Sequence, residues 1–203
     1  MLQNGLLRTI LSRRRFGRLS LMTASALVAG CGTVIETTDL QENGRYPEFS
    51  ALEPSEILVA ETIDFSIYRH LAVTLTHNDE HEKYPGFFRD SIAQYGLFDE
   101  VLSRPQLESR VIADGLAGQI EDISGPIGLH RAAQHYGPFM GLILKAGIGT
   151  NAMTINLKAL DAQTADTLFE AEREGIPLIS PDQSGFFPIF NAFADWAQSN
   201  GAA

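Results

Sequence analysis

The chain has 203 residues, a formal net charge of −10 and a single cysteine. One cysteine excludes an intramolecular disulfide, and the acidic balance argues against nucleic acid as a partner, because phosphate binding needs clustered Lys and Arg. No apolar run reaches the roughly 18–20 residues that span a bilayer, so we expect no permanent membrane-crossing helix.

The first 30 residues differ in composition from the rest of the chain. They hold five Arg and no acidic residue, and an apolar stretch follows from Leu19 to Ala29. A cationic end before a short apolar segment is the layout of an export signal. The apolar stretch is only about 17 Å long as a helix at ~1.5 Å per residue, about half of the hydrocarbon core. We therefore predict a signal peptide over residues 1–30.

Two motifs in this segment resemble those of known bacterial families. The run Ser12-Arg13-Arg14-Arg15-Phe16-Gly17-Arg18 resembles the twin-arginine export signal, with Arg13, Arg14 and Phe16 at its recognised positions and Gly17 where Leu is usual. The resemblance implies export of a domain that folds before it crosses the membrane.

The second motif, Leu27-Val28-Ala29-Gly30-Cys31, resembles the lipobox of bacterial lipoproteins. This resemblance implies that Cys31 carries diacylglycerol and a further acyl chain such as palmitate, and becomes the first residue of the mature protein. Two or more acyl chains hold a protein on a membrane essentially permanently. Gly32, in place of the Asp that favours retention in the inner membrane, favours the outer membrane, with the domain on the periplasmic face.

The mature chain from Cys31 keeps 10 basic and 25 acidic residues, a net charge of −15. Such a charge opposes adhesion to anionic lipid and nucleic acid. Residues 31–54 are polar and acidic and show no sustained periodicity, so we interpret them as a lipidated, flexible tether. Residues 55–203 are then expected to form one α/β domain.

Strand and helix patterns alternate through the first half of this domain. The run Ile57–Ala60 predicts a buried strand, and a helix is expected from Pro85 to Tyr95 with Gly96 as its stop. Residues 98–102 favour a short strand. Two helices follow, one capped by Ser103 and one beginning at Gly125-Pro126.

The second half contains mostly strand patterns. The continuous apolar run Phe139–Leu144 is typical of a central strand covered on both faces. Alternation over 153–158 and again over 169–174 predicts a hairpin with one wet face. A last helix is expected from Pro188, with Ile189, Phe193 and Trp196 on its inner side.

These patterns predict a single α/β domain with a mixed sheet packed by about four helices. The expected order is strand, helix, strand, helix, helix, strand, strand, strand, helix. Phrases such as 94–101 (QYGLFDEV), 132–137 (AAQHYG) and 160–164 (LDAQT) resemble the periplasmic domain shared by the curli-secretion lipoprotein, the LpoB-type activators of peptidoglycan synthases and the amino-terminal part of TolB. The resemblance implies scaffolding or regulation rather than catalysis.

One segment matches a metalloprotease pattern. His77-Asn78-Asp79-Glu80-His81 has the order H-x-x-E-H, in which two His bind zinc and Glu acts as base. The pattern requires a helix, whereas Asn78-Asp79 favour a loop. We interpret it as a solvated loop, with metal binding through His77, Glu80 and His81 as the alternative.

No other catalytic pattern is found. The chain lacks a G-x-S-x-G elbow, and its only cysteine is assigned to the lipid. The glycine-rich run 145–150 has the wrong order for a phosphate-binding loop, so no cofactor is expected. The sequence therefore favours a protein that is not an enzyme.

The run Gly185–Phe190 is the densest aromatic stretch. Phe186, Phe187 and Phe190 either pack in the core, as such stripes usually do, or form an exposed patch for a protein partner. The leading hypothesis is a lipid-anchored envelope protein that binds another envelope protein or itself. The alternative is a small metal-dependent hydrolase acting on cell-wall material.

Overall fold

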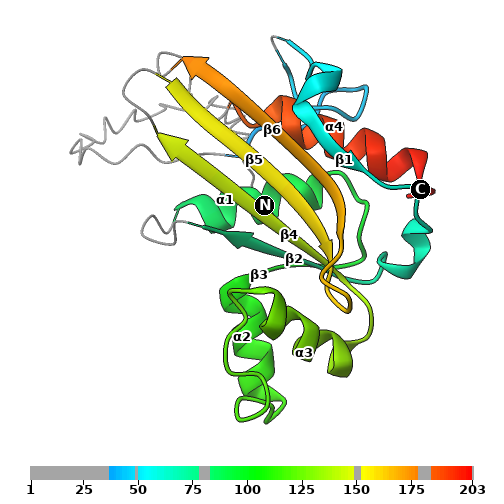
Figure 1. Cartoon of the computed structure of the whole chain (residues 1–203), viewed down its shortest axis with the longest axis vertical. Coiled ribbons are helices and arrows are strands. Elements are labelled where there is room, and N and C mark those ends of the chain that lie inside the picture. The colour runs from blue at the N-terminus through cyan, green and yellow to red at the C-terminus, as the bar shows by residue number, and fades with distance from the viewer. Residues whose placement is uncertain (1–36, 49, 78–82, 149–151, 178–183, 203) are drawn as a thin grey trace, which may run out of the picture. The chain divides into compact units, whose positions relative to one another are not determined.

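The computed structural model describes residues 37–48, 50–77, 83–148, 152–177 and 184–202. Six strands form one mixed sheet in the order β1-β6-β5-β4-β2-β3 (Figure 1). The strands are β1 (Ile57–Ala60), β2 (Ala72–Thr76), β3 (Val101–Ser103), β4 (Met140–Ile148), β5 (Ala152–Asp161) and β6 (Thr167–Pro177). The helices are α1 (Lys83–Gln94), α2 (Arg104–Ala113), α3 (Pro126–Tyr136) and α4 (Phe187–Ser199), with short 3-10 turns η1 (Pro54–Glu56) and η2 (Phe65–Ile67).

The α/β class, the mixed sheet and the four helices are confirmed. The predicted hairpin is the antiparallel pair β5–β6, and β4 lies between β5 and the parallel strand β2. Ser103 caps α2, where its side chain and that of Gln106 form a reciprocal capping box. Gly96 has a φ of +65°, the left-handed conformation expected after a helix.

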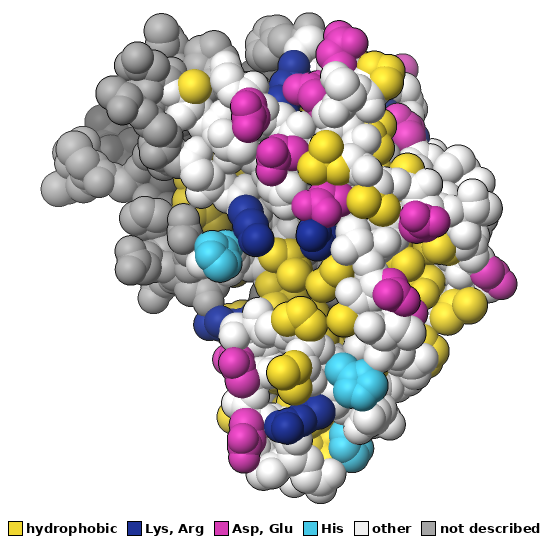
Figure 2. Space-filling view, in the orientation of Figure 1, with side chains coloured by type: hydrophobic (Ala, Val, Ile, Leu, Met, Phe, Trp, Pro, Cys, Tyr) yellow, Lys and Arg dark blue, Asp and Glu magenta, His cyan; other side chains and the backbone are white. Residues whose placement is uncertain are grey.

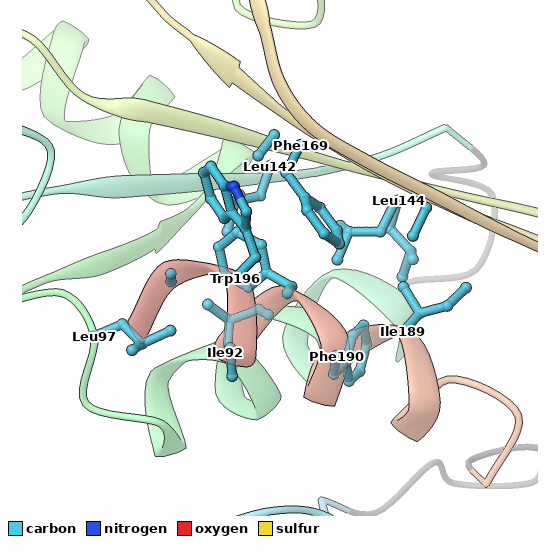
Figure 3. Close-up of a cluster of buried hydrophobic side chains, with 14 of the residues drawn as sticks. Ile92, Leu97, Leu142, Leu144, Phe169, Ile189, Phe190 and Trp196 are labelled. Carbon is cyan, nitrogen blue, oxygen red and sulfur yellow. The ribbon is translucent and has the colours of Figure 1, made fainter. Parts of the chain in front are cut away.

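Each face of the sheet covers a separate hydrophobic core. Alternate residues of β4 point to opposite faces, so Met140, Leu142 and Leu144 pack with α1 and α4. Ile143, and Phe139 just before the strand, pack with α2 and α3. Figure 3 shows the first core, where side chains from α1, α4 and the sheet meet. The apolar run Phe139–Leu144 is therefore covered on both faces of the sheet, as the sequence predicted.

Three sequence expectations differ from the structure. Strand β2 was not predicted, although it pairs with both β3 and β4. Strand β1 was expected to be buried, but it is the outer strand of the sheet, and Ile57 and Leu58 are 37% and 54% exposed. Apolar composition alone cannot distinguish a central strand from an outer one.

The third difference concerns the tether predicted over residues 31–54. Tyr46 is 1% exposed and belongs to the core formed with α1 and α4. The last part of the predicted tether is thus packed on the domain, because a large aromatic side chain gains free energy when it is buried.

Candidate functional site

The residues predicted to direct export and lipidation lie outside the described part of the chain. This applies to Arg13, Arg14, Phe16 and Cys31. Their roles stay predictions from the sequence. Among the described helices, none combines the length and apolarity that crossing a membrane requires.

Glu80 and His81 of the H-x-x-E-H segment also lie outside the described residues, whereas His77 is described and exposed. The His77 backbone N–H donates to the carbonyl of Leu144, 3.1 Å away, which continues the β2–β4 pairing by one residue. Within the described ranges, no group of three His, Cys, Asp or Glu is placed to hold a metal ion.

The aromatic side chains proposed as a partner surface are buried. Phe186, Phe187 and Phe190 are 0%, 3% and 0% exposed. In Figure 3, Phe190 and Ile189 lie with the core residues of α4 and the sheet rather than at an open surface. Helix α4 is apolar on nearly all sides, and α1 and Tyr46 cover the faces that point away from the sheet. The three Phe side chains therefore present no surface to a partner.

Instead, α4 binds a segment of the chain itself. The side chain of Asn191 accepts from the Tyr46 backbone N–H at 2.9 Å and donates to the Tyr46 carbonyl at 3.0 Å. This pairing satisfies both polar backbone groups of a buried residue. The Tyr95 hydroxyl donates to the same Asn191 oxygen at 2.7 Å.

The Tyr46 ring completes this contact. It stacks on Phe187 with centroids 4.7 Å apart and meets Tyr95 edge-on at 5.4 Å. Its hydroxyl donates to the Ser91 carbonyl at 2.9 Å. Burial raises the pKa of Tyr46 to about 12 and also raises the pKa of Tyr95. Both phenols therefore stay protonated and keep donating at neutral pH.

Arg45 extends the contact to the exposed side of α4. Its guanidinium pairs with Asp195 and donates to the Gln198 side chain at 2.6 Å. The Asp195 side chain is 66% exposed, so water screens this ion pair and it contributes little to stability. The buried Tyr46 is the main anchor of the segment.

An open groove of about 400 Å³ lies beside this anchored segment. Strand β1 and α4 form two of its sides, and these elements lie near one another in Figure 1. Its lining is mostly apolar and includes no Lys or Arg. The lining residues are Glu48, Ala51, Leu52, Ile57, Ala60, Phe169, Pro188, Asn191, Ala192, Asp195, Trp196 and Ser199.

Trp196 has a fixed position in this groove. Its indole Nε1–H donates to the Glu61 carbonyl at 2.9 Å, and its ring packs against Phe169 with centroids 5.3 Å apart. These two contacts fix α4 against β6 and against the residue that follows β1, so the sides of the groove are joined to each other.

A second open region is the sheet face on the side of α2 and α3. Lys158 lies opposite Glu170, with 2.9 Å between Nζ and Oε2, and Asn156 donates to Glu170 and Glu172. Figure 2 shows side chains of both charges on this face, above an apolar hollow. Burial opposes ionisation of Glu170, but the hydrogen bonds from Lys158 and Asn156 outweigh it and lower the pKa of that carboxyl.

Sequence reasoning missed Asn191, Tyr46 and the groove. Asn191 stands inside a strongly apolar helix, and a polar residue in such a position needs a buried partner. A polar residue in an apolar helix was therefore a signal that Asn191 has a buried partner. The sequence does not identify that partner, Tyr46, because it lies 145 residues away along the chain.

No family model matches this sequence, and no curated protein matches it. Among solved structures, the chain is similar to the LpoB C-terminal domain from Salmonella enterica, at 17% identity over 58% of this chain and 87% of that one, with a TM-score of 0.40. It is similar to lipoprotein GNA1162 from Neisseria meningitidis at 13% identity, over 66% and 99% of the two chains, with a TM-score of 0.38.

A third similar structure is the PelC dodecamer from Paraburkholderia phytofirmans. It is 10% identical and covers 70% of this chain and 93% of that one, with a TM-score of 0.35. Similarity this distant carries no conclusion about activity or partners.

Proposed function

We propose that this chain is a lipoprotein of the cell envelope whose α/β domain binds another envelope protein. The observation that carries the proposal is the order of features from Arg8 to Cys31: clustered Arg, a short apolar stretch, small residues and the only cysteine. Acyl chains on Cys31 would hold the acidic domain at a membrane from which its own charge would otherwise keep it.

The domain itself supports a binding role. It offers an open groove with an apolar lining and a few polar groups, a type of surface that binds ligands and peptides. Export by the twin-arginine route and residence in the outer membrane belong to the proposal on the strength of Arg13, Arg14 and Gly32.

Lipidation is tested by growing cells with an alkyne-labelled fatty acid and measuring the intact mass of the purified protein. We expect label on the wild type, a mature chain that begins at Cys31, and partition into the detergent phase. The Cys31→Ser variant should carry no label and enter the aqueous phase. An unmodified thiol at Cys31 or a chain that still begins at Met1 would overturn the proposal.

Binding to an envelope protein is tested by crosslinking in intact cells, followed by mass spectrometry of the attached peptides. We expect one dominant crosslinked envelope protein. Products that contain only this chain would replace partner binding with self-assembly.

A further inference from the structure

Strand β1 is an outer strand without the usual protection of such strands. It pairs with β6 on one side, and no strand among the described residues pairs with its other side. Natural outer strands commonly carry Lys or Pro, which discourage pairing with another chain. The four residues of β1, Ile57–Ala60, are all apolar, and Leu58 is 54% exposed.

The ladder shows which backbone groups of β1 are directed outwards. The Glu61 N–H donates to the Leu168 carbonyl at 2.9 Å, and Ala60 lies opposite Phe169. Residues of an antiparallel pair alternate between bonding the partner strand and pointing away from it. The N–H and C=O of Ala60 therefore point away from β6, where an added strand could bond them.

The groove lies on the helix side of this edge. Ile57 and Ala60 line it from β1, and Pro188, Ala192 and Trp196 line it from α4. An extended peptide that pairs with β1 would direct alternate side chains to this side of the sheet. Backbone pairing combined with a pocket for alternate side chains is how peptides are bound by strand addition.

The charge around β1 favours one kind of peptide. Between Tyr46 and Tyr68 the chain has five acidic residues and no basic one. Glu56 lies near Arg173 and Asp195 lies near Arg45, whereas Glu53 and Glu61 flank β1 and are exposed. Glu48 lines the groove, where its carboxylate accepts one hydrogen bond from the Asn191 amide at 3.1 Å and keeps its charge. Positive charges at both ends of a bound peptide would meet these carboxylates.

The same charges oppose pairing between two copies of this chain. Antiparallel pairing of two β1 strands would bring Glu53 and Glu56 of one copy towards Glu61 of the other. Like charges placed across an interface cost binding free energy. The occupant that fits is thus a different protein.

We propose that β1 and the neighbouring groove bind an extended segment of another protein, with apolar side chains at alternate positions and Lys or Arg at both ends. This inference rests on the proposed function, since it assigns the binding surface of that function. The segment would add a seventh strand to the sheet.

The test uses two labelled nine-residue peptides, Lys-Lys-Val-Ser-Val-Ser-Val-Lys-Lys and the same core with Glu in place of each Lys. Binding to the full chain is measured by fluorescence anisotropy in one detergent buffer. We expect saturable binding of the Lys peptide that weakens as salt is raised, and at least tenfold weaker binding of the Glu peptide. Equal binding of the two peptides would overturn the proposal.

Variants locate the site. The double variant Glu48→Gln and Glu61→Gln should weaken binding of the Lys peptide about tenfold, whereas Glu121→Gln, an exposed residue outside the site, should not change it. Ala192→Phe should fill the groove and weaken binding at least tenfold, whereas Ala113→Phe, at an exposed position of α2, should not change binding. Unchanged binding to both site variants would refute the proposal.

Ala60→Pro removes the outward N–H, and thermal unfolding checks that the variant is folded. A folded Ala60→Pro variant that binds the Lys peptide as well as the wild type would contradict strand addition. The measurements are repeated with Cys31→Ser. Unchanged affinity in that variant shows that the surface acts independently of the lipid, so failure of lipidation and failure of this site give different results.

Discussion

Asn191 is the residue on which the anchored segment most depends. It is 4% exposed and bonds the Tyr46 backbone on both sides and the Tyr95 hydroxyl. The Asn191 amide thus supplies the hydrogen-bond partners that the Tyr46 backbone, which belongs to no helix or strand, would otherwise lack. The single polar side chain of α4's inner surface thus joins the start of the described chain to its last helix.

Removing this side chain should destabilise the fold. In Asn191→Ala, the N–H and C=O of Tyr46 and the Tyr95 hydroxyl lose their partner, and each buried unsatisfied group costs about 1–3 kcal/mol. We expect the free energy of unfolding to fall by about 3 kcal/mol, measured by urea denaturation. Asn43→Ala, whose side chain makes an exposed bond to Arg45 N–H, should change it by less than about 0.5 kcal/mol. Equal effects would contradict the role given to Asn191.

Glu170 should make the free energy of unfolding depend on pH. Its folded pKa is lowered, because hydrogen bonds from Lys158 and Asn156 outweigh the effect of burial. A lowered carboxyl pKa contributes stability that is present above the unfolded pKa, ~4.3, and is lost as pH falls through the folded pKa. The wild type should exceed Glu170→Gln in unfolding free energy by about 1 kcal/mol at pH 7.

The difference between these two proteins should shrink when urea denaturation is repeated at about pH 3, below the unfolded pKa of ~4.3, because the unfolded carboxyl then binds a proton that the folded carboxyl resists. A difference that stays constant between the two pH values would show that packing, rather than charge, makes Glu170 stabilising.

At the scale of elements, one glycine allows α3 to pack closely against the loop that precedes it. Gly128 is buried in α3, and a Cβ built on it would overlap the carbonyl oxygen of Asp122 in the preceding loop. Ile120 and Ile123, on either side of that oxygen, belong to the core under α2 and α3. The loop cannot move away without exposing these side chains.

Gly128→Ala should therefore destabilise the protein by about 3 kcal/mol or more, the range of overpacked cores. Gly86 is the matched control, since it also lies in a helix and no atom lies within 4 Å of a Cβ built there. Gly86→Ala should stabilise α1 by up to about 1 kcal/mol, because Ala favours helix over Gly. Thermal unfolding measures both, and a Gly128→Ala protein as stable as the wild type would refute this packing.

Elements whose ends carry local signals could be predicted from the sequence. Ser103 with Gln106, Gly96 and Pro126 are chemical signals for where helices start and stop, and the structure uses each of them. Strand β2 was missed because it has only five residues, and pairing with β3 and β4 defines it. Exposure of β1 was missed because the order of strands in a sheet depends on contacts distant along the chain.

The candidate site was less predictable for the same reason. The groove is formed by side chains near and within β1 together with Phe169 of β6 and residues of α4, and no short motif encodes such a meeting. The aromatic run 186–190 correctly indicated an important element, but its side chains fill the core. Asn191 and Asp195, further along α4, contact the anchored segment.

At the scale of the whole molecule, the anchored segment sets how far the domain can stand from a membrane that holds Cys31. A free chain from Cys31 to Pro54 would span at most about 80 Å at ~3.4 Å per residue. Because Leu40 packs against the core and donates its N–H to the Gln94 side chain, and Tyr46 is buried against α4, the chain that can span the gap ends before Leu40 and reaches at most about 30 Å. Docking of Tyr46 therefore keeps the domain and its groove closer to the lipid surface.

Trypsin can measure this docking, because Arg45 is the only Lys or Arg between Arg18 and Arg69. In the wild type, the Arg45 guanidinium is bound to Asp195 and Gln198 and the next residue is buried, so the bond after Arg45 is protected. Cleavage of such a site follows the population of the open form, which rises about tenfold for each 1.4 kcal/mol of docking free energy lost. On membranes, Tyr46→Ala should release residues 46–203 at least about tenfold faster than the wild type, whereas Tyr136→Ala, far from this segment, should leave cleavage at Arg45 unchanged. Equal release rates for wild type and Tyr46→Ala would mean that the segment opens freely and does not limit the reach of the domain.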